Sequence, residues 1–224
     1  MKQNSPENRK QKLFKQLYII GITGGVGAGK SSVLAVIRDR YQGWVIQADE
    51  VGHRLRKPGK PIHQWMVREY GEAVLFGDGT INPRAVAALA FRDEEAMKRL
   101  NGATHPLIRE EILRELKEKE ASLPEGTVGV VALEAALLKE GNLSGLCDEI
   151  WYIHAPKETR ISRLMESRGY TRERCGEIMS RQADEETFLR EADLVIENGS
   201  SVHKMEEQIS RRLETVLQEQ KENT

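Results

Sequence analysis

The amino-acid sequence predicts an α/β fold, in which a parallel sheet of five strands lies between layers of helices. Two observations lead to this prediction. Five short apolar runs are rich in β-branched or aromatic residues without strict alternation, which is typical of strands covered on both faces. Helical patterns follow most of these runs, and strands that alternate with helices build a parallel sheet. The expected strands are residues 17–22, 44–46, 128–133, 150–154 and 194–196.

Helical patterns occupy much of the chain between and after these runs. The expected helices are residues 31–40, 106–120, 157–168, 172–181 and 202–219. Ser200 or Ser201 could cap the last helix, because a serine hydroxyl accepts a hydrogen bond from an N–H group of the first turn. Residues 47–127 have little strand character and include a turn-like Phe-Gly-Asp-Gly at 76–79. We expect an insertion of this size to bind a substrate.

Length and charge limit the possible functions. A chain of 224 residues, 39% of them hydrophobic, is long enough for one good core and short for two. We therefore expect a single domain over residues 17–224. The 34 Lys and Arg nearly cancel the 35 Asp and Glu, so no overall field attracts nucleic acid or an anionic membrane. Small-molecule ligands at a local anion site are expected instead.

The N-terminal segment and the cysteines indicate an internal protein. Residues 1–16 are polar and basic without an apolar core, so we expect a disordered leader and no secretory signal. No run approaches the ~20 apolar residues of a membrane span. Cys147 and Cys175 form no CxxC pair, which argues against a zinc knuckle or a disulfide framework. The expected location is cytoplasmic.

A glycine-rich segment between the first expected strand and the first expected helix fits the pattern G-x-x-x-x-G-K-[ST]. Its glycines let the backbone curl so that N–H groups point at phosphate oxygens, and the following helix adds the positive end of its dipole. Lys30 is expected to reach the β- and γ-phosphates of ATP, and the Ser31 hydroxyl to bind Mg²⁺. The predicted ATP-binding residues are Gly24, Gly25, Val26, Gly27, Ala28, Gly29, Lys30, Ser31 and Ser32.

A phosphate loop alone does not separate a kinase from a GTPase or a motor ATPase. The base-reading motif N-K-x-D of GTPases is absent from the sequence. A small kinase needs a carboxylate near the acceptor hydroxyl, a substrate pocket and mobile arginines. Asp49 ends the second strand pattern, and the carboxyl ends of parallel strands face the ligand crevice. Asp49 is therefore a candidate base, with an N-cap of the next helix as the alternative.

Arginines gather in two neighbouring helical patterns late in the chain. They are Arg160, Arg163, Arg168, Arg172, Arg174 and Arg181. A lid of about residues 157–185 that closes over ATP would carry such arginines. We expect one or two of them to contact phosphate, with Arg163 and Arg168 as the candidates, and the others to be solvated surface.

These pieces together resemble the dephospho-coenzyme A kinase family from about Tyr18 to about Leu217. The matching pieces are residues 22–31, 48–49, 57–59, 105–109, 134–138 with Glu140, 163–165, 168–169, Gln182, 192–193 and 195–198. Each piece is short and common. Their succession in this order and at these intervals is typical of one family.

The resemblance implies a three-layer P-loop kinase fold with a helical substrate-binding insertion and a helical lid. It implies transfer of the γ-phosphoryl group of ATP to the ribose 3′-hydroxyl of dephospho-coenzyme A, with Asp49 as the base or orienting carboxylate. Residues 51–118, including His105 and Arg109, would form the coenzyme-binding part. Asn198 would lie near the adenine of ATP. Without the resemblance, His105 is explained by packing beside a helix that starts at Pro106.

Three positions depart from the family pattern. Gln47 stands where many members have an additional Asp, so the chemistry would rest on Asp49 alone. Glu134 begins a Glu-Ala-Ala segment where Asp-Val-Pro is usual. Because the Glu side chain is longer than that of Asp, a contact with Mg²⁺ through water is as good an interpretation as a direct contact. A contact of Glu134 with the substrate is also expected. Phe188 stands where a basic residue is frequent, so the charge of the lid would come from Arg181 or Arg190 instead.

Two other functions stay open at this point. A nucleoside monophosphate, shikimate or gluconate kinase would share the loop, the lid and the sheet, and only the middle segment discriminates. A nucleotide-binding module without catalysis is the second alternative, against which Lys30, Ser31 and Asp49 argue.

Overall fold

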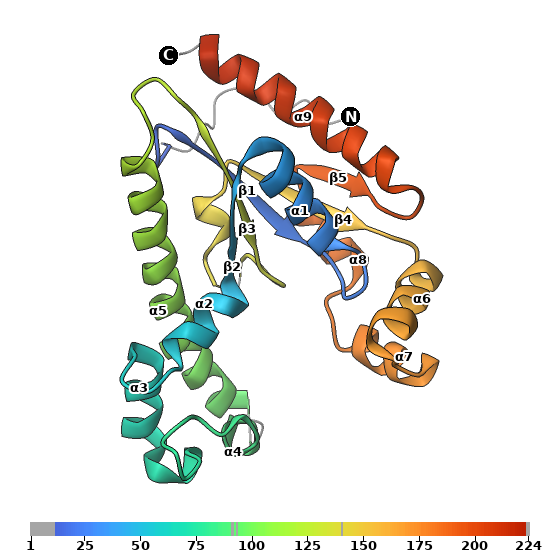
Figure 1. Ribbon diagram of the computed structural model, residues 1–224. Helices are drawn as coiled ribbons and strands as arrows, with labels where there is room; N and C mark the ends of the chain where they lie inside the picture. The colour runs from blue at the N-terminus through green and yellow to red at the C-terminus, as the bar shows by residue number, and fades with distance from the viewer. Residues whose placement is uncertain (1–11, 91, 93, 140, 223–224) are drawn as a thin grey trace.

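A parallel sheet forms the centre of the molecule (Figure 1). The computed structural model describes residues 12–222 apart from 91, 93 and 140. The strands are β1 (Leu17–Thr23), β2 (Trp44–Gln47), β3 (Gly129–Glu134), β4 (Glu149–His154) and β5 (Leu194–Glu197). All neighbours pair in parallel, in the order β2-β3-β1-β4-β5. The predicted sheet is confirmed, and each predicted strand end lies within one residue of the observed one.

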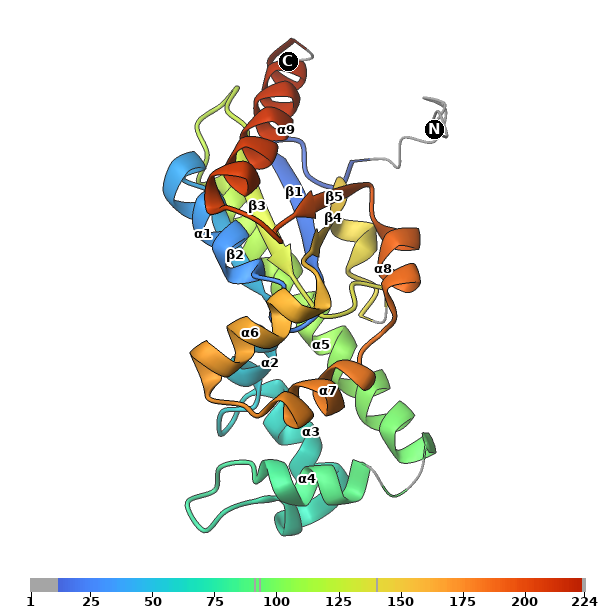
Figure 2. The same cartoon turned by 90° about the vertical axis from the view of Figure 1, so that its right-hand side faces the viewer.

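Helices cover both faces of the sheet because the side chains of each strand alternate between two cores. In β1, Leu17 and Ile19 belong to one core, whereas Tyr18 and Ile20 belong to the other. The first core includes side chains of α5, and the second includes side chains of α1 and α9. These helices lie on opposite faces of the sheet (Figures 1 and 2). These helices are α1 (Lys30–Tyr41), α5 (Glu94–Ala121) and α9 (Val202–Glu222). The result is the three-layer arrangement that the sequence predicts.

The insertion between β2 and β3 is helical, as predicted, and lies beyond the carboxyl ends of the strands (Figure 1). Its elements are α2 (Ala48–Leu55), α3 (Pro61–Tyr70), the 3₁₀ turn η2 (Gly71–Val74), α4 (Pro83–Ala90) and most of α5. The predicted turn at 76–79 lies between Leu75 and Ile81, which form an antiparallel bridge.

The prediction that a helix starts at Pro106 is wrong, because α5 begins at Glu94 and runs through the proline. Proline suits a first turn, but inside a helix it removes a single backbone hydrogen bond and adds local crowding. Side chains buried on both sides of it keep the helix continuous through packing. They are Ala96 and Thr104 before the proline, and Ile112 and Leu116 after it.

Two helices beside the phosphate loop make a small body of their own (Figure 2). They are α6 (Lys157–Arg168) and α7 (Arg172–Ser180), and they share a core of Ile161, Leu164 and Cys175. A further short helix, α8 (Glu185–Glu191), was not predicted. Phe188 attaches it to the sheet, because its ring stacks on Tyr152 at a centroid distance of 5.2 Å. Phe188 therefore has a packing role, whatever charge other family members carry there.

The chain is packed before the first strand begins. Phe14 lies within the segment expected to be a disordered leader, yet its side chain is only 3% exposed and belongs to the core under β1. The backbone N–H of Gln16 donates to Glu120 at 2.9 Å. The disordered leader was expected to extend to residue 16, but residues 14 and 16 make packing and hydrogen-bond contacts. Residues 1–11 lie outside the described part. None of the described helices has the length and apolar character of a membrane span.

Candidate active site

The phosphate loop follows β1 and leads directly into α1, as the sequence pattern predicts. Gly27 and Gly29 adopt positive φ angles of 77° and 89°, which side chains other than glycine rarely tolerate. A Cβ atom at Gly29 would also lie 2.2 Å from Nδ2 of Asn198. Ser31 and Ser32 are exposed in the first turn of α1. The loop therefore needs glycine for its shape and leaves two hydroxyl groups accessible at the helix N-terminus.

Lys30 joins the loop to the end of the neighbouring strand. Its Nζ atom donates to the carbonyl oxygen of Gly24 at 2.8 Å and lies 3.7 Å from Oε1 of Glu134. Burial lowers the pKa of the Lys30 ammonium group, while the carboxylates of Glu134 and Asp49 oppose that shift. The ammonium group is thus held at the loop, between the strand that bears Glu134 and the helix that bears Asp49.

Gln47 and Glu134 are register partners at the last rung of β2 and β3. Their side chains meet, because Nε2 of Gln47 donates to Oε2 of Glu134 at 3.2 Å. Gln47 is also the N-cap residue of α2, but its side chain makes no capping hydrogen bond. The residue that departs from the family pattern therefore orients the second oxygen of Glu134, while the first oxygen faces Lys30.

Asp49 does not end β2, as the sequence suggests, but lies two residues beyond that end. The strand β2 ends at Gln47, so Asp49 is the second residue of α2, and the alternative role as N-cap is wrong because Gln47 holds that position. The Asp49 side chain is exposed and lines two adjoining cavities, of about 530 and 170 Å³. Asp49 therefore stands between Lys30 and the open space over the insertion.

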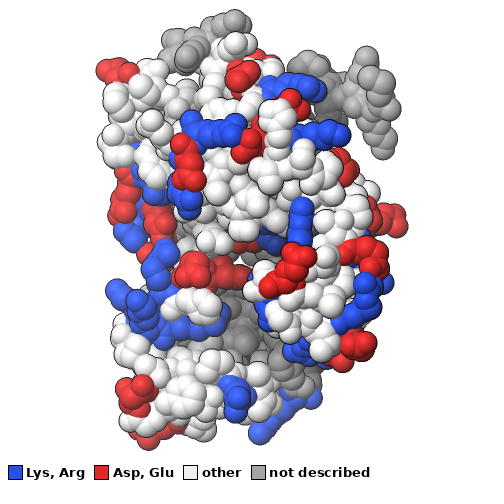
Figure 3. Space-filling model, turned by 45° about the vertical axis from the view of Figure 1, so that its right-hand side comes forward, with Lys and Arg blue, Asp and Glu red and all other residues white. Residues whose placement is uncertain are grey.

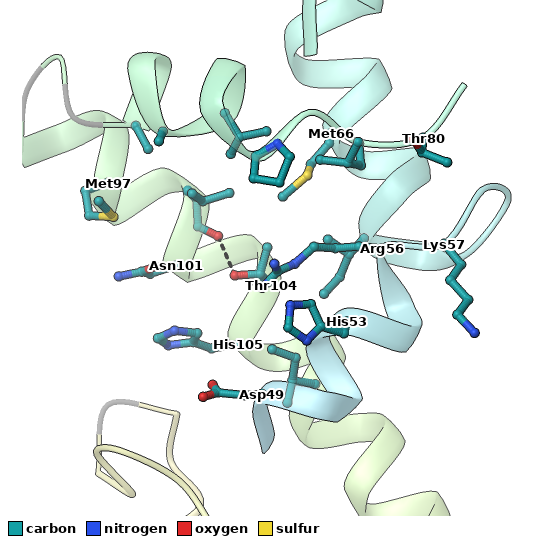
Figure 4. Close-up of a pocket in the computed structure, with 18 of the residues that line it drawn as sticks. Asp49, His53, Arg56, Lys57, Met66, Thr80, Met97, Asn101, Thr104 and His105 are labelled. Atoms are coloured by element: carbon teal, nitrogen blue, oxygen red, sulfur yellow. Dashed lines mark hydrogen bonds between the residues drawn. The ribbon is translucent and has the colours of Figure 1, made fainter. Parts of the chain in front are cut away.

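The larger cavity is polar at one end and apolar at the other (Figure 4). Asp49 and His105 lie at the polar end, whereas Met66 and Met97 lie at the opposite end. The other apolar lining comes from α3, α4 and α5 and includes Ile62, Val86, Leu100 and Ile108. A long acceptor with an apolar portion fits such a cavity.

Basic side chains border the open face of this cavity. Arg56 and Lys57 belong to its lining and follow α2. The surface is hollowed between the insertion and the body of α6 and α7, with Lys and Arg on both sides of the hollow (Figure 3). Anionic groups of a ligand would find cations there, although the protein as a whole is nearly neutral.

His105 and Arg109, predicted together, lie in different surroundings. His105 lines both cavities that Asp49 lines. Arg109 lines a neighbouring cavity of about 760 Å³, which His105 also borders, and its Nε donates to the carbonyl oxygen of Asn142 at 3.3 Å. His53 also lines the cavity of about 530 Å³. The structure thus brings His53 and His105, but not Arg109, to the cavity with Asp49.

The predicted lid arginines differ sharply in position. Arg163 donates to the carbonyl oxygens of Ala28 and Asn198 at 3.2 and 2.8 Å, so it lies against the phosphate loop. Arg168 is exposed, and its guanidinium group lies 5.9 Å from the centre of the Tyr170 ring. Arg160, expected to be solvated surface, instead donates from Nε to the carbonyl oxygen of Val26 at 2.8 Å. Arg160 and Arg163 are thus the two that reach the loop.

Asn198 also lies behind the phosphate loop. Its side chain is 3% exposed, and Nδ2 donates to the carbonyl oxygen of Ala28 at 2.8 Å. Arg163 bonds the same carbonyl oxygen. Asn198 therefore fixes the end of the loop, and its expected position near adenine stays a prediction.

Comparisons with known proteins agree on one family. A family model described as dephospho-CoA kinase matches residues 18–204. The dephospho-CoA kinase of Carboxydothermus hydrogenoformans is 32% identical over 92% of this chain and 95% of its own. That of Geobacter sulfurreducens is 34% identical over 88% of this chain and 96% of its own. The solved structure of TT1252 from Thermus thermophilus shares 33% identity with a TM-score of 0.72, covering 91% of this chain and 98% of its own.

Proposed function

The chain belongs to the dephospho-CoA kinase family, and from this membership we propose that it transfers the γ-phosphoryl group of ATP to the ribose 3′-hydroxyl of dephospho-coenzyme A. This reaction completes coenzyme A synthesis. The observation that carries the proposal is the position of Asp49. It lines the cavity over the insertion, and its negative charge opposes the lowering of the Lys30 pKa that burial causes.

The phosphate loop would hold ATP. Lys30 would neutralise charge that develops on the transferred group, because its ammonium group is already directed at the loop by Gly24. On binding ATP, this contact would be exchanged for phosphate oxygens. The body of α6 and α7, together with the segment up to about residue 185, would act as the lid that excludes water.

Asp49 would accept or orient the proton of the attacking hydroxyl group. A general base must lie within hydrogen-bond reach of that proton, and an exposed carboxylate on the cavity wall can do so. Holding the hydroxyl in line with the phosphorus atom removes much of the entropy cost of the reaction. His105, on the wall of both cavities beside Asp49, would contact the ribose or its neighbouring groups.

The insertion would bind the remainder of the coenzyme. Dephospho-coenzyme A carries a pyrophosphate and a long arm that ends in a thiol. Arg56 and Lys57 would meet the pyrophosphate, and the apolar end around Met66 and Met97 would receive part of the arm. A small acceptor such as shikimate would leave most of the 530 Å³ cavity unfilled.

Mg²⁺, bound with ATP, would neutralise charge on the phosphate oxygens. The residues fit this ion, since the exposed Ser31 hydroxyl and the Glu134 carboxylate offer hard oxygen donors near Lys30. Within the described residues, no group of three or more His, Cys, Asp or Glu could hold a metal alone. Such a sparse set suits Mg²⁺, which keeps several waters and relies on phosphate. We expect Ser31 to bind it directly and Glu134 through water.

Initial rates with a panel of acceptors test the proposal. Dephospho-coenzyme A should be phosphorylated with a kcat/KM at least about 10³-fold above AMP, shikimate and gluconate, because only it fills the cavity and reaches its basic border. A clear preference for one of the other acceptors would establish a different kinase. No turnover with any of them, while ATP still binds, would favour the non-catalytic module. The cytoplasmic location stays a prediction.

A further inference from the structure

Val26 of the phosphate loop is held on several sides by the body of α6 and α7 and by the segment that follows it. Its backbone N–H donates to Oε1 of Gln182 at 3.0 Å. Its carbonyl oxygen accepts from Nε of Arg160 at 2.8 Å. The two partners are also bonded to each other, since NH2 of Arg160 donates to the same Oε1 atom at 3.1 Å. Three hydrogen bonds thus close a ring around one residue of the loop.

The Val26 side chain adds an apolar contact to this ring. It packs against the small core of Ile161, Leu164 and Cys175 that joins α6 to α7. A backbone that is bonded through both polar groups, and whose side chain is also packed, has little freedom left. Val26 therefore links the phosphate loop to the body of α6 and α7.

The two glycines beside Val26 leave room for Arg160. A Cβ atom at Gly25 would lie 2.2 Å from NH2 of Arg160, and one at Gly27 would lie 2.8 Å from the carbonyl oxygen of Arg160. The sequence pattern explains these glycines by phosphate alone. The structure adds that α6 lies against the loop at both positions.

We propose that Gln182 is a positioning residue for the phosphate loop, which acts together with Arg160 by holding the Val26 peptide. A loop with glycine at residues 24, 25, 27 and 29 would lose much conformational entropy on ordering around a triphosphate. The ring around Val26 fixes part of that order before the nucleotide arrives, which strengthens binding. It also turns the Val26 carbonyl oxygen toward a guanidinium group. The inference rests on the proposed function only in taking ATP as the nucleotide.

The chemistry of Gln182 allows a sharp test, because both hydrogen bonds are accepted by its oxygen. Gln182→Glu keeps an acceptor of the same shape and should preserve the ring. Gln182→Leu keeps the approximate size and removes the acceptor. Gln64→Leu is a matched control, since Gln64 lies on α3 and donates to Gly59.

Hydrogen exchange of the Val26 amide, measured without nucleotide, reports the ring directly. Gln182→Leu should speed this exchange about tenfold or more, and it should weaken ATP affinity in calorimetry by about five- to tenfold, as the loss of one or two hydrogen bonds predicts. Gln182→Glu should keep the wild-type exchange rate, and Gln64→Leu should behave like the wild type in both measurements. Neither measurement requires a phosphoryl acceptor such as dephospho-coenzyme A, so failure of the proposed reaction would not affect the result.

Unchanged Val26 exchange in a folded Gln182→Leu variant would overturn the proposal. Weaker ATP binding with unchanged exchange would also contradict it, because Gln182 would then contact the nucleotide directly. Fast exchange in Gln182→Glu would refute the role of the oxygen acceptor. If Gln182→Leu has a low melting temperature, Arg160→Lys supplies the second variant. It keeps the charge but replaces the planar fork that spans Val26 and Gln182 with a single nitrogen atom, so the same two changes are expected.

Discussion

Lys30→Ala should leave the protein folded and lower the rate of phosphoryl transfer by about 10²–10³-fold, the effect expected when one preorganised donor to a developing charge is lost. The ammonium group is the only part of the side chain that can neutralise phosphate oxygens, and alanine offers nothing in its place. Its partner Glu134 keeps the hydrogen bond from Gln47, so one bond to that carboxylate survives.

The measurements for this variant are turnover at saturating ATP and the melting temperature. Lys139→Ala is a suitable control, because Lys139 is an exposed lysine that also faces a carboxylate, that of Glu191 on α8 at 3.1 Å. The control should be close to the wild type, since exposed ion pairs contribute little. Near-normal turnover of a folded Lys30→Ala variant would contradict the assignment of the phosphate loop.

Asp49→Asn should bind ATP nearly normally and turn over about 10²–10⁴-fold more slowly, as expected for a lost general base. Asparagine keeps the size of the side chain and loses its charge. An effect of this substitution could not be explained by a changed helix cap. Asp49 is the second residue of α2, and the N-cap position, where Asp and Asn are interchangeable, is occupied by Gln47.

Glu50→Gln provides the matched control for Asp49→Asn. Glu50 is the next residue of the same helical turn and is also exposed, but it does not line the two cavities of Asp49. The control should retain wild-type turnover, and both variants should show similar melting temperatures. Wild-type turnover of Asp49→Asn would refute a catalytic role, and equal losses in both variants would show that negative charge at the start of α2 matters, rather than the position of one carboxylate.

The sheet could be predicted from sequence because its strands are buried on both faces. Runs such as 17–22 and 150–154 are largely apolar without alternation, and polar residues, glycine or proline lie within two positions of their ends. The phosphate loop could also be predicted from the sequence, since its pattern and its place between a strand and a helix are local features.

The start of α5 and the position of Asp49 were missed for local reasons. Proline is common at the first turn of a helix, so Pro106 locally suggests a helix start. Tertiary packing of residues on both sides of Pro106 keeps α5 continuous instead, and the local sequence does not show that packing. The register of β2 with β3 ends the strand at Gln47, and no signal in the sequence marks that end.

Helical spacing carries information about which arginines of α6 share a side of the helix. Successive residues of a helix are about 100° apart around its axis, so Arg160 and Arg163 lie about 60° apart, whereas Arg168 lies about 140° from Arg163. Once Arg163 is placed at the loop, helical phase favours Arg160 over Arg168 as the second residue there. The buried residues Ile161 and Leu164 do not make this choice, because Arg168 falls between them around the helix axis. The contact of Gln182 with Val26 joins residues 156 positions apart, and nothing local predicts it.

The central claim is that this chain phosphorylates the 3′-hydroxyl of dephospho-coenzyme A, and two deoxy analogues of the acceptor test it most directly. With ATP, the 2′-deoxy analogue should be converted to a product one phosphoryl group heavier, as measured by mass spectrometry. The 3′-deoxy analogue should give no such product, although it should compete with the natural acceptor, because the insertion still binds the rest of the molecule. Phosphorylation of the 3′-deoxy analogue, or a 2′-deoxy analogue that binds but is never phosphorylated, would contradict the account.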